Sequence, residues 1–177
     1  MTIQTDRLVL RPLCVDDLET THRYASDREN ARYMMFLPND SEEETLDFLR
    51  EAQEEWGKER PDFYEFAVCL NGTHIGAVSV YRQEDGETAE LGWIFDKRYW
   101  GRGYAAEAAR ALTQACVREL GFTRFIAHCD SENAGSYRLM ERLGMRRAGC
   151  HPGRKNRASD EERSEYVYEM DGAAPEI

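Results

Sequence analysis

The chain has 177 residues, the length of one ordinary domain with a buried core, and we predict a single domain over residues 1–177. Its formal net charge of −11 argues against nucleic-acid binding, because phosphate recognition needs a basic face. An acidic chain favours a cationic or amine-bearing partner, although solvated glutamates on helix faces account for most of the charge.

Five scattered cysteines without a CxxC pair predict neither a disulfide framework nor a metal site. The opening residues, MTIQTDRLVLRPL, contain no long apolar segment, so we expect neither a signal peptide nor a membrane span. These features predict a cytoplasmic protein without a bound metal.

Two helices are predicted in the first third of the chain, after a strand at residues 8–12. The segment DDLETTHRYAS contains Asp16 and Glu19, which have the spacing of an N-terminal capping box. Ser41 and Glu44 repeat this spacing at the start of SEEETLDFLREAQEEW. One stripe of this second helix is formed at helical spacing by Leu49, Ala52, Gln53 and Trp56.

The clearest hairpin is predicted at residues 63–81, where polar and apolar residues alternate on both sides of Asn71 and Gly72. This Asn-Gly pair accepts the positive φ angles of a tight type I′ turn. Another strand is expected at residues 88–96.

The second half of the chain predicts two helices, at residues 104–120 and 133–144. Gly121 and Gly144 are expected to end them, and Asn133 caps the start of the second. Strands are expected at residues 123–130, 146–150 and 164–170, and the polar segment 153–165 is expected to be a loop. This order predicts a mixed α/β fold with a mainly antiparallel first half and no regular βαβ alternation.

The segment DKRYWGRGYAAEAARAL places Gly101 and Gly103 between a strand and a helix. The first turn of a helix has free backbone N–H groups and the positive end of the helix dipole, so bare glycines there let an anion approach closely. Arg98 and Arg102 are placed to add positive charge. An isolated G-x-G is more simply a turn kept for its dihedral angles, so other motifs must decide.

The same residues fit the dinucleotide pattern G-x-G-x-x-A, which makes a nicotinamide oxidoreductase an alternative. Three features count against it. Residues 97–100 separate the strand from the glycines, no acidic residue follows about 20 positions on, and a hairpin occupies the place of the first βαβ unit.

The segment RYWGRGYA resembles the [Q/R]-x-x-G-x-G/A signature of the GNAT superfamily of acetyl-CoA-dependent N-acetyltransferases, with Arg98, Gly101 and Gly103 at its fixed positions. NAGSYRLMERLGM is similar to the family's N-x-x-S pattern and the short helix after it, and TDRLVLRPL is similar to its opening strand. The resemblance runs from about residue 5 to residue 170. These pieces look most like the branch that acetylates the N-termini of ribosomal proteins.

This resemblance implies a GNAT-type α/β fold, a twisted and mostly antiparallel sheet with splayed central strands, flanked by helices. It implies that acetyl-CoA is the co-substrate and that the amides of the glycine loop hold its pyrophosphate. The strand at residues 90–96 would splay from its neighbour at residues 124–130 to admit the pantetheine arm. The residues that it assigns to acetyl-CoA are Trp93, Ile94, Phe95, Arg98, Gly101, Arg102, Gly103, Tyr104, Ala105 and Asn133.

Acetyl transfer to an amine needs a base, donors for the oxyanion and a proton source for the leaving thiolate, but no covalent intermediate. Glu90 is our candidate base, directly or through water, although a carboxylate that simply faces solvent is an equally good interpretation. His128 and Cys129 cannot both face the slot, because side chains alternate along a strand, and we interpret both as structural.

Many family members protonate the thiolate with a tyrosine seven positions after the asparagine, where this chain has Met140. Methionine cannot donate a proton. Ser136 resembles a serine of the ribosomal-protein branch and is our candidate for this role, with Tyr137 as the alternative. Glu107 is interpreted as support for the glycine loop.

The expected acceptor is the N-terminal amine of a protein or peptide. The alternatives are a small amine, such as a polyamine or an antibiotic, and a non-catalytic acyl-CoA-binding protein. By the resemblance, the acceptor pocket is built from helices near residues 27–36 and 41–56 and from the loop at 153–165, where no motif is readable. The sequence does not decide the oligomeric state, and a homodimer is one of the alternatives.

Overall fold

Within residues 1–172, which the computed structural model describes, eight strands form one sheet in the order β1-β2-β3-β4-β5-β6-β8-β7. Neighbouring strands pair antiparallel, except for the parallel pair β5 and β6. The strands are β1 Ile3–Gln4, β2 Leu8–Pro12, β3 Phe63–Leu70, β4 Thr73–Arg82, β5 Thr88–Phe95, β6 Arg124–Asp130, β7 Arg146–Lys155 and β8 Glu162–Asp171. The helices are α1 Leu18–Ala25, α2 Glu42–Trp56, α3 Tyr104–Ala115 and α4 Ala134–Arg142. The predicted mixed, mostly antiparallel sheet is confirmed.

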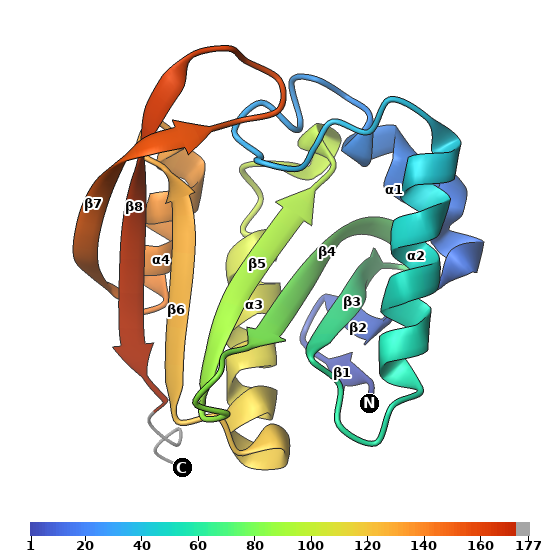
Figure 1. Ribbon diagram of the computed structural model, residues 1–177. Coiled ribbons are helices and arrows are strands. Elements are labelled where there is room, and N and C mark those ends of the chain that lie inside the picture. The colour runs from blue at the N-terminus through green and yellow to red at the C-terminus, as the bar shows by residue number, and fades with distance from the viewer. Residues whose placement is uncertain (173–177) are drawn as a thin grey trace.

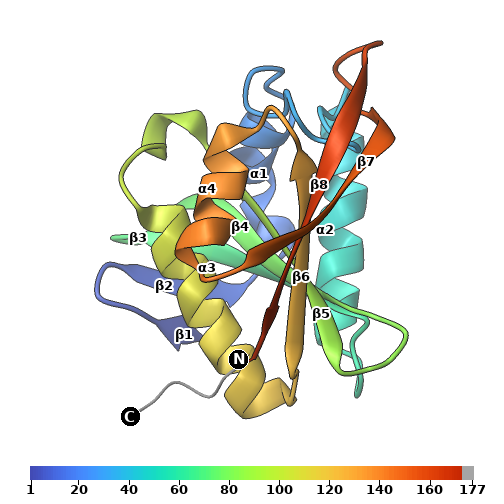
Figure 2. The ribbon, with the colours of Figure 1, turned by 90° about the vertical axis from the view of Figure 1, so that its left-hand side faces the viewer.

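The sheet has helices on both faces (Figure 2). α3 and α4 cover one face, where Leu112 and Met140 join the main buried cluster. α2 covers the other face over β3, where Leu49 and Ala67 belong to a second cluster, and α1 packs beside α2. On this second face, no helix of the described chain lies over β5, β6 and β8 (Figure 1).

The two central strands separate along their length. Parallel pairing joins residues 88–90 of β5 to residues 124–126 of β6. Beyond Glu90, β5 runs on to Phe95 and β6 to Asp130 without further pairing to each other, and Figure 1 shows the strands diverging. Residues 91–95, which pair only with β4, form the free end of β5. The predicted splay is confirmed, and it leaves a slot in the middle of the sheet.

The start of α1 differs from the prediction that Asp16 caps it. A 3₁₀ turn over Val15–Asp17 precedes the helix. The Asp17 carboxylate accepts two hydrogen bonds from the Arg11 guanidinium, at 2.8 and 2.7 Å, and one from the Cys14 N–H, at 3.1 Å. The capping pattern missed this arrangement because the stronger, charged donor lies on β2.

The predicted turn and cap around α2 and β3 are present. Asn71 and Gly72 both have positive φ, 50° and 81°, as a type I′ turn requires. Ser41 Oγ accepts a hydrogen bond from the Glu44 N–H at 3.3 Å. Gln53 is an exception in the predicted stripe, since its side chain is exposed.

The helix predicted at residues 104–120 is α-helical only as far as Ala115. One π-helical turn over Cys116–Leu120 follows, and Gly121 ends it with a φ of +72°. A π turn keeps the same residues near the core with wider spacing, so a search for a 3.6-residue period does not detect it.

The prediction of a loop at residues 153–165 is wrong. β7 extends to Lys155 and β8 begins at Glu162, so only residues 156–161 connect them. Most of β7 is exposed at the edge of the sheet, and it therefore carries charged residues instead of an apolar alternation. The helix expected near residues 27–36 is also absent, since residues 28–33 form consecutive turns.

A carboxyl group is buried on the α2 face of the sheet. Glu65 of β3 is 6% exposed, and the Tyr81 hydroxyl donates a hydrogen bond of 2.6 Å to its Oε1. Burial raises the pKa of Glu65 from 4.5 to about 7. Between these two values the folded state keeps a proton that the unfolded state has lost, so stability falls as pH rises.

We expect the wild-type free energy of unfolding to fall by up to about 3 kcal/mol between pH 5 and pH 8 because of Glu65, at about 1.36 kcal/mol per unit. Glu65→Gln, which still accepts from Tyr81 but does not titrate, should remove this fall. Urea unfolding across the pH range measures it. Glu51→Gln, an exposed position on α2, is the control. Parallel stability curves for wild type and Glu65→Gln would contradict the assignment.

Candidate active site

The glycine loop connects the free end of β5 to α3. Gly101 and Gly103 have φ angles of +74° and +81°, a region that L side chains rarely adopt. Gly103 is the N-cap residue of α3, and no side chain caps the first turn. The N–H groups of that turn are therefore available to a ligand, and the helix dipole favours an anion there.

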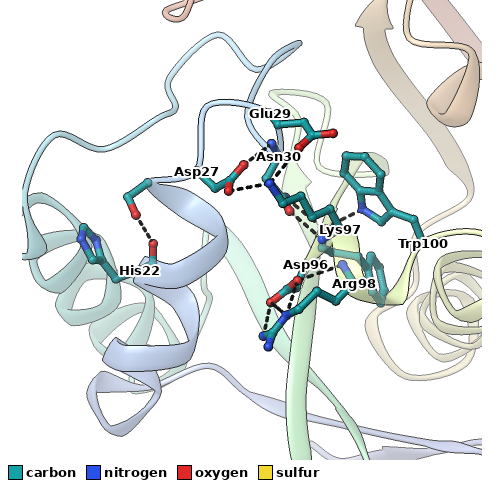
Figure 3. A network of polar contacts seen from close by, with 10 residues as sticks. His22, Asp27, Glu29, Asn30, Asp96, Lys97, Arg98 and Trp100 are labelled. Atoms are coloured by element: carbon teal, nitrogen blue, oxygen red, sulfur yellow. Dashed lines mark hydrogen bonds and ion pairs between the residues drawn. The ribbon is translucent and has the colours of Figure 1, made fainter.

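The segment after α1 braces this loop (Figure 3). Asn30 Oδ1 accepts a hydrogen bond from the Lys97 backbone N–H at 2.7 Å, and Asn30 Nδ2 donates to the Phe95 backbone carbonyl at 2.9 Å. The Lys97 ammonium pairs with Asp27 and Glu29, both at 2.8 Å. The end of β5 and the start of the loop are thus fixed by residues about 65 to 70 positions earlier.

The side chains of the two loop arginines, which were expected to add positive charge beside the glycines, lie beside Asp96 and Tyr99. The Arg98 guanidinium pairs with the Asp96 carboxylate (Figure 3), with a shortest distance of 2.5 Å. This pairing lowers the pKa of Asp96. Arg98 is not among the residues that line the cavity between the glycine loop and α4. The Arg102 guanidinium lies 6.0 Å from the Tyr99 ring centre and is also outside that cavity.

The turn between β1 and β2 holds the loop from its other side. Glu107 of α3 accepts hydrogen bonds from the Thr5 hydroxyl at 2.6 Å and from the Arg7 side chain at 2.7 Å. Arg7 in turn donates to the Arg102 carbonyl at 3.1 Å. These contacts agree with the interpretation of Glu107 as support for the loop.

A cavity of about 630 Å³ opens between the glycine loop, the free end of β5 and the start of α4. The predicted cofactor residues that line it are Trp93, Ile94, Phe95, Gly101, Gly103, Tyr104, Ala105 and Asn133. Lining residues that the sequence did not single out individually include Glu29, Asn30, Arg32 and Tyr33, from the segment 27–36 expected to build the acceptor pocket, and Trp100. Trp100 lies inside the glycine motif, whereas the others come from the turns after α1, which carry no motif.

A second cavity of about 230 Å³ adjoins the first at Arg32 and Tyr33, which line both. It lies between the turns after α1 and the tip of the β7–β8 hairpin, from which Asn156 and Arg163 contribute. Two of the three predicted acceptor segments therefore meet beside the larger cavity.

Ser136 lies at the wall of the larger cavity and is 8% exposed. The Trp93 indole N–H donates a hydrogen bond of 3.1 Å to Ser136 Oγ, and the Asn133 side chain caps α4 by accepting from the Ser136 N–H at 3.2 Å. Because an indole only donates, Ser136 accepts this bond, and its own proton remains a donor, with the Cys129 thiol as its neighbour.

The alternative acid points elsewhere. Tyr137 packs edge-on against Tyr166 of β8, with ring centres 5.9 Å apart, and does not line the cavity. Met140 is fully buried in the main cluster. The geometry thus brings Ser136, and not Tyr137, to the site.

Glu90 and His128 lie where β5 and β6 separate. His128 Nδ1 is 2.9 Å from Glu90 Oε1, and this hydrogen bond is the largest cause of the raised pKa of His128. Neither residue lines the larger cavity. The neighbouring Cys129 is buried on the other face, where burial raises the pKa of its thiol to about 11 and disfavours the thiolate.

Two kinds of feature are absent from the part of the chain that the structure describes. Within residues 1–172, no helix combines the length and hydropathy that a membrane crossing requires. The same residues contain no group of three or more His, Cys, Asp or Glu side chains arranged to hold a metal ion.

The chain belongs to the GNAT acetyltransferases, since residues 7–146 match the family model described as "Acetyltransferase (GNAT) domain". It is 33% identical over 151 residues to the uncharacterized N-acetyltransferase YnaD of Bacillus subtilis (strain 168), covering 84% of this chain and 85% of YnaD. Family membership makes the protein an acetyltransferase and displaces the nicotinamide alternative.

Solved structures extend this likeness. A GNAT-family acetyltransferase from Bacillus anthracis superposes with a TM-score of 0.83 at 32% identity, covering 97% of this chain and 99% of that one. A candidate ribosomal-protein-serine acetyltransferase from Vibrio cholerae gives a TM-score of 0.77 at 28% identity, covering 97% of each chain. At 18% identity, a spermidine N-acetyltransferase from Vibrio cholerae shares the fold, with a TM-score of 0.82 and coverage of 95% and 97%.

Proposed function

We propose that this chain, as one catalytic domain, transfers the acetyl group of acetyl-CoA directly to the N-terminal α-amine of a protein or peptide. The observation that carries the proposal is the glycine loop, whose uncapped helix N-terminus faces a cavity that continues along the free end of β5 to Ser136. This arrangement suits a cofactor with an anionic end and a long, narrow reactive arm.

In this proposal the backbone amides from residue 101 to residue 105 hold the pyrophosphate. Arg98, which is held by Asp96, does not join them. The pantetheine arm lies along Trp93, Ile94 and Phe95, where β5 has unpaired backbone groups on its β6 side. The thioester then reaches the slot between the two strands, beside Ser136.

The reacting groups approach from the two faces of the sheet. Ser136 protonates the departing thiolate from the α4 side, since its bond from Trp93 uses the hydroxyl only as an acceptor and its proton can turn from the Cys129 thiol to the thiolate. Glu90 serves the acceptor amine from the opposite side, by the route described in the next subsection. The buried, high-pKa thiol of Cys129 makes a poor acyl carrier, which favours direct attack by the amine.

An α-amine acceptor is supported by the energy needed to deprotonate it. At pH 7 this costs about 1.4 kcal/mol for an α-amine with a pKa near 8, and about 4.6 kcal/mol for a lysine near 10.4. A site with only a modest base is therefore better suited to the α-amine. The likeness to the candidate ribosomal-protein-serine acetyltransferase also favours a protein acceptor. A small amine is the second candidate, because the spermidine enzyme has the same fold.

We expect peptides with a free N-terminus to release coenzyme A thiol faster than N-acetylated peptides that offer only a lysine, at neutral pH and equal concentration. The assay measures thiol release over a panel that also contains spermidine and an aminoglycoside. Faster turnover of spermidine or of the lysine peptides would overturn the α-amine assignment and leave the acetyltransferase activity intact.

A further inference from the structure

We propose that His128 is the proton acceptor for the attacking amine and that Glu90 is a positioning residue that orients its imidazole ring. The inference rests on the proposed amine acetylation and changes the role of Glu90, which the sequence suggested as the base. It also assigns a function to His128, which the sequence suggested was structural.

The first argument is the geometry of the pair. His128 Nδ1 and Glu90 Oε1 are 2.9 Å apart. A carboxylate only accepts, so the neutral imidazole carries its proton on Nδ1 and has a lone pair on Nε2. Within residues 1–172, Nε2 has no hydrogen-bond partner. Glu90 therefore directs a basic nitrogen outward, as a carboxylate does in a paired acid–base arrangement.

The second argument is the position of the pair in the sheet. Glu90 belongs to the last paired position between β5 and β6, and His128 lies two residues beyond its partner Ile126, beside the slot. Ala127 and Cys129 are in the cluster under α3 and α4, so alternation turns His128 to the other face. That face of β5 and β6 has no helix of the described chain over it (Figure 1). An amine arriving there meets the base on one side of the sheet and Ser136 on the other.

The third argument is the charge around the ring. Apart from Glu90 on β5, the charged groups that influence His128 are Glu165 on β8 and Arg154 on β7, which pair with each other. Tyr81 of β4 stands opposite Glu90 in the strand register. Both carboxylates raise the pKa of His128, whereas burial and Arg154 lower it, and the raised direction prevails. A plot of kcat against pH should therefore have an acidic limb, in which kcat falls as His128 is protonated, and the midpoint of this limb should lie above the ordinary histidine value of about 6.5.

The reaction balances with these two groups. The amine nitrogen bonds to the carbonyl carbon of the thioester and gives one proton to His128 Nε2, and the carbon–sulfur bond breaks. The thiolate takes a proton from Ser136, which is restored from water, and the imidazolium returns its proton to water. The products are the acetylated amine and the free thiol of coenzyme A.

The test measures kcat against pH with both substrates saturating, so that titration of the free amine does not contribute. We expect His128→Gln to lower the kcat plateau at least about tenfold and to abolish the acidic limb. Glu90→Gln should keep a limb but move it to lower pH. Acetyl-CoA affinity should stay near wild type in both variants, and His151→Gln, an exposed histidine on β7, should match wild type throughout.

A second measurement does not depend on turnover. In an NMR titration of the imidazole signals, Glu90→Gln should lower the pKa of His128. A normal limb in His128→Gln, together with its loss in Glu90→Gln, would make Glu90 the base and overturn the proposal. An unmoved His128 titration would overturn the positioning role. If wild type released no thiol with any amine, the proposed function itself would fail, and the titration would still report on the pair.

Discussion

Gly103→Glu is expected to weaken acetyl-CoA binding at least about 100-fold, or about 3 kcal/mol, because two or more charge-assisted amide hydrogen bonds are lost. Gly103 has a φ of +81° and lines the cavity, and a Cβ added there would lie 3.5 Å from the Arg7 guanidinium, which braces the loop. Glutamate adds a negative charge at the position proposed for the phosphates. Titration calorimetry with acetyl-CoA measures the loss.

The control for this substitution is Gly72→Glu. Gly72 has the same φ of +81° in the β3–β4 turn, and an added Cβ would meet nothing within 4 Å. A glutamate at position 72 therefore has the same conformational cost of a positive φ as one at position 103, but far from the cavity. Gly72→Glu should lose stability and keep its acetyl-CoA affinity. A folded Gly103→Glu protein with unchanged affinity would remove the cofactor assignment of the loop.

Ser136→Ala should lower kcat at least about tenfold and leave acetyl-CoA affinity within about threefold. A positioned acid is typically worth about 10²- to 10⁴-fold in rate, and water in the cavity offsets part of the loss. The side chain keeps its size, so the pantetheine arm should still fit. Saturating kinetics with an N-terminal peptide measure kcat, and calorimetry measures affinity.

Two companion variants separate the hydroxyl from the packing around it. Ser136→Thr keeps a hydroxyl and should retain more activity than Ser136→Ala. Tyr137→Phe removes the alternative acid, whose ring packs against Tyr166 outside the cavity, and should be close to wild type. A Ser136→Ala kcat within about twofold of wild type, combined with a severe loss in Tyr137→Phe, would transfer the role to the tyrosine.

Local patterns predicted the parts of this site that depend on backbone conformation. Gly101 and Gly103 stood out because few other residues tolerate their φ angles, and Asn133 because a helix start favours a short side-chain acceptor. Motif spacing then indicated Ser136, and the structure brings it to the cavity. Each of these signals lies within a few residues of the position that it describes.

Side-chain partners were not predictable in this way, because they depend on contacts between distant segments. The sequence places Arg98 beside the glycines, but its pairing with Asp96 is visible only in three dimensions. Asn30 acts on residues 65 and 67 positions later, and His128 meets Glu90 from 38 positions away. The full length of β7 was missed for another reason. This edge strand is mostly exposed, so it has no buried face that would impose an apolar alternation on its sequence.

Asn30 also has a thermodynamic consequence. One side-chain amide ties the end of β5 to the turns after α1, and those turns contribute Arg32 and Tyr33 to both cavities. The Asn30 side chain therefore connects the glycine loop directly to the segment that walls the neighbouring cavity, and any coupling between the two sites has a physical route through it. Linkage then requires reciprocity: whatever factor one substrate contributes to the affinity of the other, it receives in return.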